Sequence, residues 1–445
     1  GYIASHYETK ERLISDLYSK APYPENLIDY FLLSEEPFSY GHYKTGVRGL
    51  YDTVKTDFYS DNRSDSLNMS SSGEAEIILL HTQFMLEPGE IKNIRYLRGC
   101  IDSEKNKAEL DADIRKLQSE SLQKYVDENE KLFSGIPEIG FDNPDKKLVY
   151  LSALNLARGC MLPPTGKTSH NFYVFSREPL WGWGHGHQVL HESLSMMAYA
   201  YLDPVSAQNS QRVYMEQQRD DGLIAYRHGP RGLQDYPHKG MPTTSAPFYS
   251  WINLELYKIS KDKDFLDEAY LSGTDYLNWL LENRDTDNDG TFEWGPYGII
   301  ENVRDWYNVI FQVSEERYLD IDKEDISDEL ECLDLSLMII NEMHCLSEMA
   351  RELGMTGDAE KWKKAAEKVI TLVNERMWDQ KTGFFYHVDK KEHTFTFMER
   401  DLKRQEIIGF LPMWANAVSE ERAAVLVKTL TDTNRFWRKY GVPTL

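Results

Sequence analysis

Apolar residues recur at helical spacing through most of the chain after Pro144, and this spacing predicts a mainly helical protein. Loops with glycine, proline and polar residues separate the helices. No fixed repeat period joins them, which argues against an α-solenoid. We therefore expect helical hairpins that close into an (α/α)-barrel, with a site where alternate loops gather. The predicted helices span 147–158, 189–201, 204–219, 247–260, 264–283, 331–353, 359–377, 406–415 and 420–430.

The pattern before the barrel differs and predicts two further regions. Residues 74–86 and 91–98 have strand character, and Pro88 and Gly89 between them predict a turn. Residues 1–102 are therefore predicted to be part of a β-sandwich, although they are few for a complete one. Residues 103–129 are charged, lack glycine and proline, and carry one apolar stripe. This indicates a linker helix within 103–140, followed by the barrel at 141–445.

Composition narrows the classes of partner. The net charge of -23 argues against nucleic acid, because no basic stripe could neutralise a phosphate backbone. No apolar run approaches the ~18 residues of a membrane span. The charge is spread along the chain and predicts a soluble protein, either in the bacterial cytoplasm or periplasmic or secreted. The 4 cysteines are widely spaced and are predicted to be buried thiols. Aromatic residues make up 12% of the chain and either fill the core or stack on ring-shaped ligands.

The loop that starts at Arg284 combines carboxylates, a guanidinium and indoles. Asp285, Asp287 and Asp289 alternate before Gly290, as the oxygen ligands of a calcium loop do. An EF-hand is excluded because its twelfth position is Pro296. A Ca²⁺ site completed from elsewhere is one interpretation. The other is an Asx-turn that caps the helix ending near residue 283.

Two further stretches carry candidate chemistry. Glu301, Arg304 and Asp305 form either a plain helix start, with acids at the positive end of the dipole, or a general-acid site. In the second interpretation the neighbouring Trp306 shields Asp305 and raises its pKa, as proton donation to a leaving oxygen requires. Asp334 interrupts an apolar helix, and because an unpaired buried charge is costly, it must meet a partner or a ligand.

A glycine-loosened aromatic loop at 181–188 precedes the second predicted helix. Trp181 and Trp183, held open by glycines, suit the flat face of a sugar ring. His185 and the histidines after it also allow a zinc interpretation. Without a His-Glu-x-x-His spacing we favour a sugar site, in which the histidine and Gln188 are hydrogen-bonding groups.

Together these loops resemble glycoside hydrolase family 63 and its trehalase-like relatives, which are inverting enzymes with a β-sandwich and an (α/α)6 barrel. The similarity runs in the expected order over about 147–445. The matching stretches are 181–183, 218–227, 245–251, 284–290, 301–305, 333–335, 377–386 and 440–443.

The resemblance implies specific roles. Asp305 matches the position of the general acid, four residues after Glu301, and Arg304 with Glu301 would set its proton affinity. The glycone pocket would be lined by Trp183, Arg227, Glu293, Trp294 and Asp334. The implied ligand is an oligosaccharide or small glycoside, an α-glucoside or related α-linked sugar, cleaved from one end without a cofactor.

Two departures from the family pattern define the alternatives. Gly184 stands where the family has an acid after the second tryptophan, and the family's general base follows a segment like 440–443, near the end of this chain. An inverting hydrolase needs both carboxyl groups. We therefore expect the last helix pair and the base to come from a further C-terminal segment or a second chain. The rivals are a catalytically degenerate carbohydrate-binding or scaffold protein and a sandwich-plus-barrel sugar phosphorylase.

Overall fold

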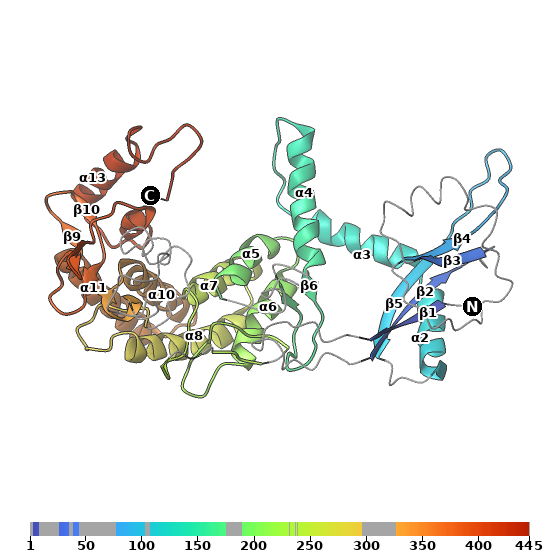
Figure 1. The fold of residues 1–445 in the computed structure, drawn as a ribbon, viewed down its shortest axis with the longest axis horizontal. Helices are drawn as coiled ribbons and strands as arrows, with labels where there is room; N and C mark the ends of the chain where they lie inside the picture. The colour runs from blue at the N-terminus through green and yellow to red at the C-terminus, as the bar shows by residue number, and fades with distance from the viewer. Residues whose placement is uncertain are drawn as a thin grey trace. The chain divides into compact units, whose positions relative to one another are not determined.

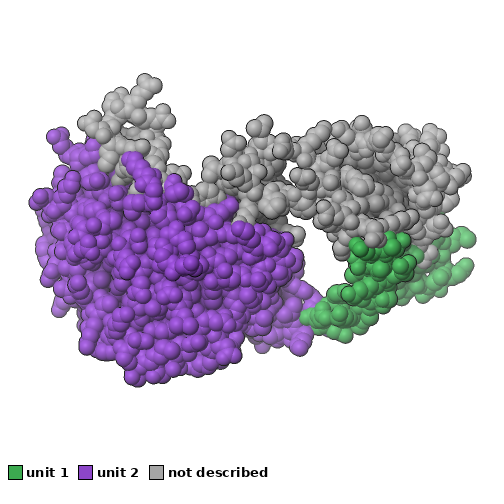
Figure 2. Space-filling view, turned by 90° about the horizontal axis from the view of Figure 1, so that it is seen from below, with its two compact units in different colours: residues 1–128 green, residues 129–445 purple. Residues whose placement is uncertain are grey.

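The computed structural model describes residues 3–8, 26–34, 39–43, 77–102, 107–174, 189–230, 232–235, 237, 239–295 and 326–444. The chain divides into two compact units, Gly1–Glu128 and Asn129–Leu445 (Figure 2). The boundary between them falls within helix α3 (Leu122–Ser134). It therefore lies inside the region predicted as a linker, and the proposed domain limits at 102 and 140 stay a prediction.

The described residues of unit 1 form two antiparallel sheets. Strands β1 (Ile3–Glu8), β2 (Asn26–Leu33) and β5 (Tyr96–Asp102) form one sheet in the order β1-β2-β5. Strands β3 (Ser39–Tyr43) and β4 (Ile77–His81) form the other (Figure 1). Strands β4 and β5 correspond to the two strands predicted around Pro88, but β4 ends at His81, β5 begins at Tyr96, and the two strands lie in different sheets. The turn itself is present, with Gly89 at φ 86, but it lies in a stretch without strand pairing.

The predicted linker helix is two helices, α2 (Lys107–Ser119) and α3. Arg95 explains where α2 ends. Its Nη1 donates to the carbonyl oxygens of Gln118 at 3.1 Å and Glu120 at 3.2 Å. These contacts satisfy backbone acceptors that a continuing helix would have used. Charge and apolar periodicity carry no signal for such a long-range cap, so the sequence predicted one helix.

The helices of unit 2 lie close to their predicted positions. Local capping explains several starts, because Asn143 and Asp203 each precede a proline and accept a hydrogen bond from the first turn. Asp262 caps α8 in the same way. The helices of this unit within the described residues are α4 (Pro144–Gly159), α5 (His191–Tyr199), α6 (Pro204–Glu216), α7 (Tyr249–Ser260), α8 (Lys263–Asn283), α10 (Leu333–Glu352), α11 (Thr356–Arg376), α12 (Leu411–Trp414) and α13 (Glu420–Leu430).

Helix α10 is the centre of the core, and most of its side chains are buried. It contacts α7, α8 and α11 (Figure 1). Of these neighbours α11 is amphipathic, with buried residues such as Trp362 on one side and lysines on the other. The predicted mainly α fold class is therefore confirmed, and pairs of successive helices are its building blocks.

Short elements complete unit 2 and shape the loops. The two-residue strands pair as β6 (Met161–Leu162) with β7 (Phe172–Tyr173), β8 (Leu330–Glu331) with β11 (Val388–Asp389), β9 (Trp378–Asp379) with β10 (Phe384–Phe385), and β12 (Thr396–Phe397) with β13 (Arg400–Asp401). The 3-10 helices are η2 (Ile326–Asp328) and η3 (Ile407–Phe410). The pairing of β8 with β11 brings the chain after α11 beside the start of α10.

Two predictions about side chains and membranes can be compared with this fold. The cysteines Cys160, Cys332 and Cys345 are free thiols and buried, as predicted. Within the described ranges, no helix combines the length and the apolarity that a membrane crossing needs.

Candidate functional site

Trp294 and Asp334 are joined directly, although 40 residues separate them in sequence. The indole Nε1 of Trp294 donates to both carboxylate oxygens of Asp334, at 3.1 and 3.2 Å. Both side chains are buried, with exposed fractions of 2% and 1%. Asp334 is the second residue of α10, so its charge also lies at the positive end of a helix dipole. The predicted partner of this buried acid is therefore the tryptophan that sequence analysis placed in the same pocket.

A buried histidine supports the start of α10. The backbone N–H of Leu333 donates to Nδ1 of His387 at 3.0 Å, so the ring proton is on Nε2, which faces Glu406 at 3.5 Å. Burial opposes the charged imidazole, but the hydrogen bond to Glu406 and the charge of Asp334 raise the pKa of His387. Burial likewise raises the pKa of Glu406. This pair fixes the helix turn that presents Asp334.

Arg284 lies against Gly295, the residue that follows Trp294. It is buried, stacks over the ring of Trp279 at 5.0 Å and donates to the carbonyl oxygen of Pro242 at 2.7 Å. Burial lowers the pKa of Arg284 to about 10. Gly295 lies directly against this guanidinium at φ 74, and an added Cβ would come within 3.0 Å of Nη1. Only glycine fits this approach without strain.

The acidic loop after α8 is folded by its own carboxylates. Asp285 accepts hydrogen bonds from the backbone N–H groups of Asp289 at 2.8 Å and Gly290 at 3.0 Å. An Asx-turn is formed by Asp289, whose Oδ1 accepts from the backbone N–H of Thr291 at 2.9 Å. The contacts of Asp285 close the loop and do not cap the helix before it. The carboxylates of Asp285, Asp287 and Asp289 also offer ligand atoms within 4.8 Å of one another, so the turn leaves the metal interpretation intact.

Further side chains join this loop from distant parts of the chain. Asp289 contacts Arg376 at 2.6 Å and Nε2 of His393 at 2.5 Å. Glu293 is fully buried and pairs with Nζ of Lys390 at 2.7 Å. Its carboxylate therefore faces the acidic loop, while its neighbour Trp294 faces Asp334.

Glu331 is the least compensated acid of the cluster. It is fully buried, and neither carboxylate oxygen accepts a hydrogen bond from a described residue. The nearby Thr291 hydroxyl, which would ease its ionisation, donates instead to Asp289 at 2.7 Å. Burial first, and then the charges of Glu293 and Asp289, raise the pKa of Glu331 to about 9. An oxygen-lined site with an unpartnered acid has the donor chemistry that Ca²⁺ prefers.

The pKa values of the other acids in this cluster shift in different directions. Burial raises the pKa of Asp285 and of Glu293. Burial also opposes ionisation of Asp289, but its hydrogen bonds with Thr291 and the charge of Arg376 lower the pKa of Asp289 overall. Carboxylates held this close repel one another unless positive charge lies nearby. The cationic side chains around the loop provide only part of that charge.

The remaining predicted site residues separate into two groups. Arg227 is buried and its backbone forms a two-way bridge with Gln234. The others lie outside the described residues, so their roles stay predictions: Trp181, Trp183, His185, Gln188, Glu301, Arg304 and Asp305. Sequence reasoning did not select Glu331, His387 or Glu406. Glu331 had a usable signal, because it stands in the same apolar stretch as Asp334 and is equally costly to bury alone.

Comparisons with known proteins agree with these observations. A family model described as the mannosylglycerate hydrolase MGH1-like glycoside hydrolase domain matches residues 180–445. An uncharacterized protein of Borreliella burgdorferi is 25% identical over 232 residues, which are 52% of this chain and 43% of that protein. A probable trehalase of Saccharomyces cerevisiae is 32% identical over 75 residues, 17% of this chain and 9% of that one. The matches thus span less than half the length of these relatives.

Solved structures give a weaker likeness. The family 63 mannosylglycerate hydrolase of Thermus thermophilus, in complex with Tris, is 16% identical at a TM-score of 0.45, covering 63% of this chain and 75% of that one. The matched region 180–445 contains every residue predicted for the sugar site, from Trp181 to Asp334. The predicted resemblance is confirmed: the chain belongs to the mannosylglycerate hydrolase MGH1-like glycoside hydrolase family.

Proposed function

We propose that this protein is an exo-acting, inverting glycoside hydrolase for an α-glucoside or a related α-linked sugar. Asp305 donates a proton to the leaving oxygen, and a second carboxyl group activates the water. Glu301 and Arg304 position Asp305. Trp183 and Trp294 contact the sugar ring, and Arg227 and Asp334 bind its hydroxyl groups.

The observation that carries this proposal is the buried pair of Trp294 and Asp334. Asp334 Oδ1 accepts from Trp294 and from the backbone N–H of Leu335 at 2.9 Å, whereas Oδ2 accepts only from Trp294 among the described residues. A carboxylate oxygen has two lone pairs, so Oδ2 retains an acceptor site for a sugar hydroxyl. Because the tryptophan fixes the carboxylate, the acid is oriented before a ligand arrives.

Asp305→Asn tests the assignment of the acid. The rate of hydrolysis by this variant should fall at least a hundredfold, because general-acid catalysis contributes a factor of about 10² to 10⁴ to the rate. Far-UV circular dichroism and sugar binding should stay unchanged. Substrates with a good leaving group, such as nitrophenyl glycosides, should lose less rate because they need less protonation. An unchanged rate on natural glycosides would remove the role of Asp305.

A substrate panel separates hydrolysis from its rivals. The panel contains α-glucosides from the proposal itself and trehalose and mannosylglycerate from the names of the matched relatives, with β-glucosides as controls. Proton NMR of the first products should show the inverted anomer. Binding without any sugar release would favour the degenerate carbohydrate-binding protein, whereas release that depends on added phosphate would favour the phosphorylase.

We also propose that the acidic loop holds a structural Ca²⁺ through Asp285, Asp287 and Asp289, with Glu331 as a further oxygen ligand. The support is the donor set and the buried, unpartnered carboxylate of Glu331. The competing arrangement is an internal network in which Arg376 and His393 alone balance Asp289. In that arrangement the loop needs no ion.

Thermal unfolding distinguishes these arrangements without reference to activity. CaCl₂ at a hundred times its dissociation constant should stabilise the protein by about 2.7 kcal/mol over an EDTA-treated sample. Glu331→Gln should remove most of this gain, and Glu360→Gln, an exposed residue of α11, should keep it. Equal melting temperatures with CaCl₂ and EDTA would favour the internal network.

A further inference from the structure

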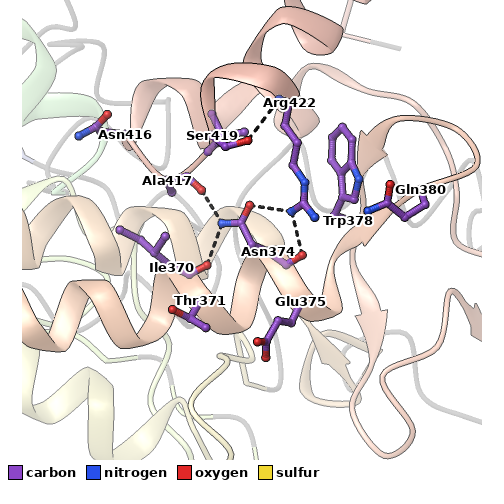
Figure 3. Close-up of a pocket in the computed structure, with 11 residues that line it drawn as sticks. Ile370, Thr371, Asn374, Glu375, Trp378, Gln380, Asn416, Ala417, Ser419 and Arg422 are labelled. Atoms are coloured by element: carbon purple, nitrogen blue, oxygen red, sulfur yellow. Dashed lines mark hydrogen bonds between the residues drawn. The ribbon is translucent and has the colours of Figure 1, made fainter.

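A pocket of about 660 Å³ lies between the C-terminal half of α11 and the first turn of α13 (Figure 3). None of its lining residues belongs to the predicted sugar site. Ile370, Ala417 and Val418 give it an apolar part, and Trp378 and Arg422 face each other across one side. Its volume is in the range that holds a small organic molecule.

Arg422 is rigidly held in this pocket. Its Nη1 donates to the backbone oxygen of Asn374 at 2.9 Å and to Oδ1 of the same residue at 2.8 Å. Asn374 is itself fixed, because its Nδ2 donates to the carbonyl oxygens of Ile370 at 2.8 Å and Ala417 at 2.7 Å. The guanidinium also lies over the ring of Trp378, 4.8 Å from its centroid. Its orientation is therefore set before any ligand binds.

The charge of Arg422 is not balanced by an acid. No carboxylate of the described residues acts on it, although Glu375 lines the same pocket. Burial lowers the pKa of Arg422, and no neighbouring acid offsets this effect. Since Nη1 makes the contacts to Asn374, the other guanidinium nitrogens are available to an acceptor.

Trp378 supplies a second donor. Its side chain is only 9% exposed, and its Nε1–H has no acceptor among the residues that the structure describes. A buried unpaired donor costs about 1 to 3 kcal/mol, so a bound acceptor would be favourable here. Arg422 lies over the ring of Trp378, and Phe385 packs against the same ring in a T-shaped arrangement with the centroids 4.8 Å apart.

We propose that this pocket binds the carboxylate of a small organic acid with an apolar body, held by the Arg422 guanidinium and the Trp378 indole N–H. A planar guanidinium matches a carboxylate in geometry as well as charge. Ile370, Ala417 and Val418 contact the apolar body. The exposed acid Glu375 in the lining disfavours a doubly charged phosphate and selects a single negative charge.

Matched probes test the proposal on the whole chain. Phenylacetate carries the charge and an apolar ring, phenylacetamide keeps the shape without the charge, and acetate keeps the charge without the ring. Isothermal titration calorimetry or ligand-observed NMR should show that phenylacetate binds at least tenfold more tightly than either analogue. A loss of this size is expected when one charge-assisted hydrogen bond is removed.

Variants then locate the binding. Arg422→Gln should weaken phenylacetate at least tenfold, and Trp378→Phe, which keeps a ring under the guanidinium but lacks the N–H, about threefold or more. Lys428→Gln removes another cation of α13 that does not line the pocket and should bind like the parent. Circular dichroism checks that each variant folds. If Arg422→Gln does not fold, the proposal is still tested by Trp378→Phe and by the comparison of phenylacetate with phenylacetamide. Equal binding of acid and amide, undiminished binding in these variants, or no binding at millimolar phenylacetate would overturn the proposal.

Discussion

Glu342 on α10 caps a different helix and should make the stability of the fold depend on pH. Helix α7 begins after Phe248, whose side chain cannot accept a hydrogen bond. Its first backbone N–H groups instead donate to the Glu342 carboxylate, from Ser250 at 2.6 Å and from Trp251 at 3.2 Å. The carboxyl group is buried, with an exposed fraction of 1%. Burial outweighs these hydrogen bonds and raises the pKa of Glu342 from 4.5 to about 7.

The sign and size of the effect follow from linkage. In the unfolded chain this carboxyl loses its proton near pH 4.5, whereas in the fold it keeps the proton to about pH 7. Between these values the folded state binds more protons, so the free energy of unfolding falls as the pH rises. Each pH unit corresponds to about 1.4 kcal/mol. Glu342 should therefore remove about 3 kcal/mol of stability between pH 4.5 and 7, and nothing more above that.

Urea unfolding followed by circular dichroism from pH 5 to 8 measures this slope. Glu342→Gln cannot titrate, so its free energy of unfolding should fall less steeply than that of the parent, and the difference should approach 3 kcal/mol at pH 8. Other buried acids act equally in both proteins and cancel in the difference. Glu360→Gln, an exposed residue, should leave the slope unchanged. Parallel curves for the parent and Glu342→Gln would refute the reasoning.

Two more predictions concern packing and the buried pair. Trp294→Phe removes the indole donor and leaves the Asp334 carboxylate with a single backbone partner among the described residues, so we expect a loss of about 1.5 to 3 kcal/mol in urea unfolding. Asp334→Asn in the same background should restore part of this loss, and additive losses would contradict the pairing. Gly409→Ala would drive a methyl group into the ring of Phe384 and should cost about 1 to 3 kcal/mol. Gly357→Ala, where nothing lies within 4 Å, should be neutral or up to about 1 kcal/mol stabilising in a calorimetric melt.

The sequence by itself determined the helices of unit 2 to within a few residues. Helical periodicity and capping are local signals: Asn143 before Pro144 starts α4, and the pattern at 264–283 differs from α8 by a single residue. Strand partners depend on contacts with residues far along the chain, so the sequence indicated strand character near β4 and β5 but not that they pair with β3 and β2. The sequence did not predict the break between α2 and α3 for the same reason, because Arg95, which contacts the end of α2, lies outside that helix.

Only the tertiary structure decided what the polar residues contact. Acid motifs could be read from the sequence, since a buried charge needs a partner, and this reasoning located Asp334 before its partner was known. It could not choose that partner, nor join Glu293 to Lys390 across 97 positions of sequence, because such contacts depend on how helices and loops pack. Local patterns fix where a helix forms, whereas side-chain pairing, burial and pKa depend on neighbours that only the folded chain brings together.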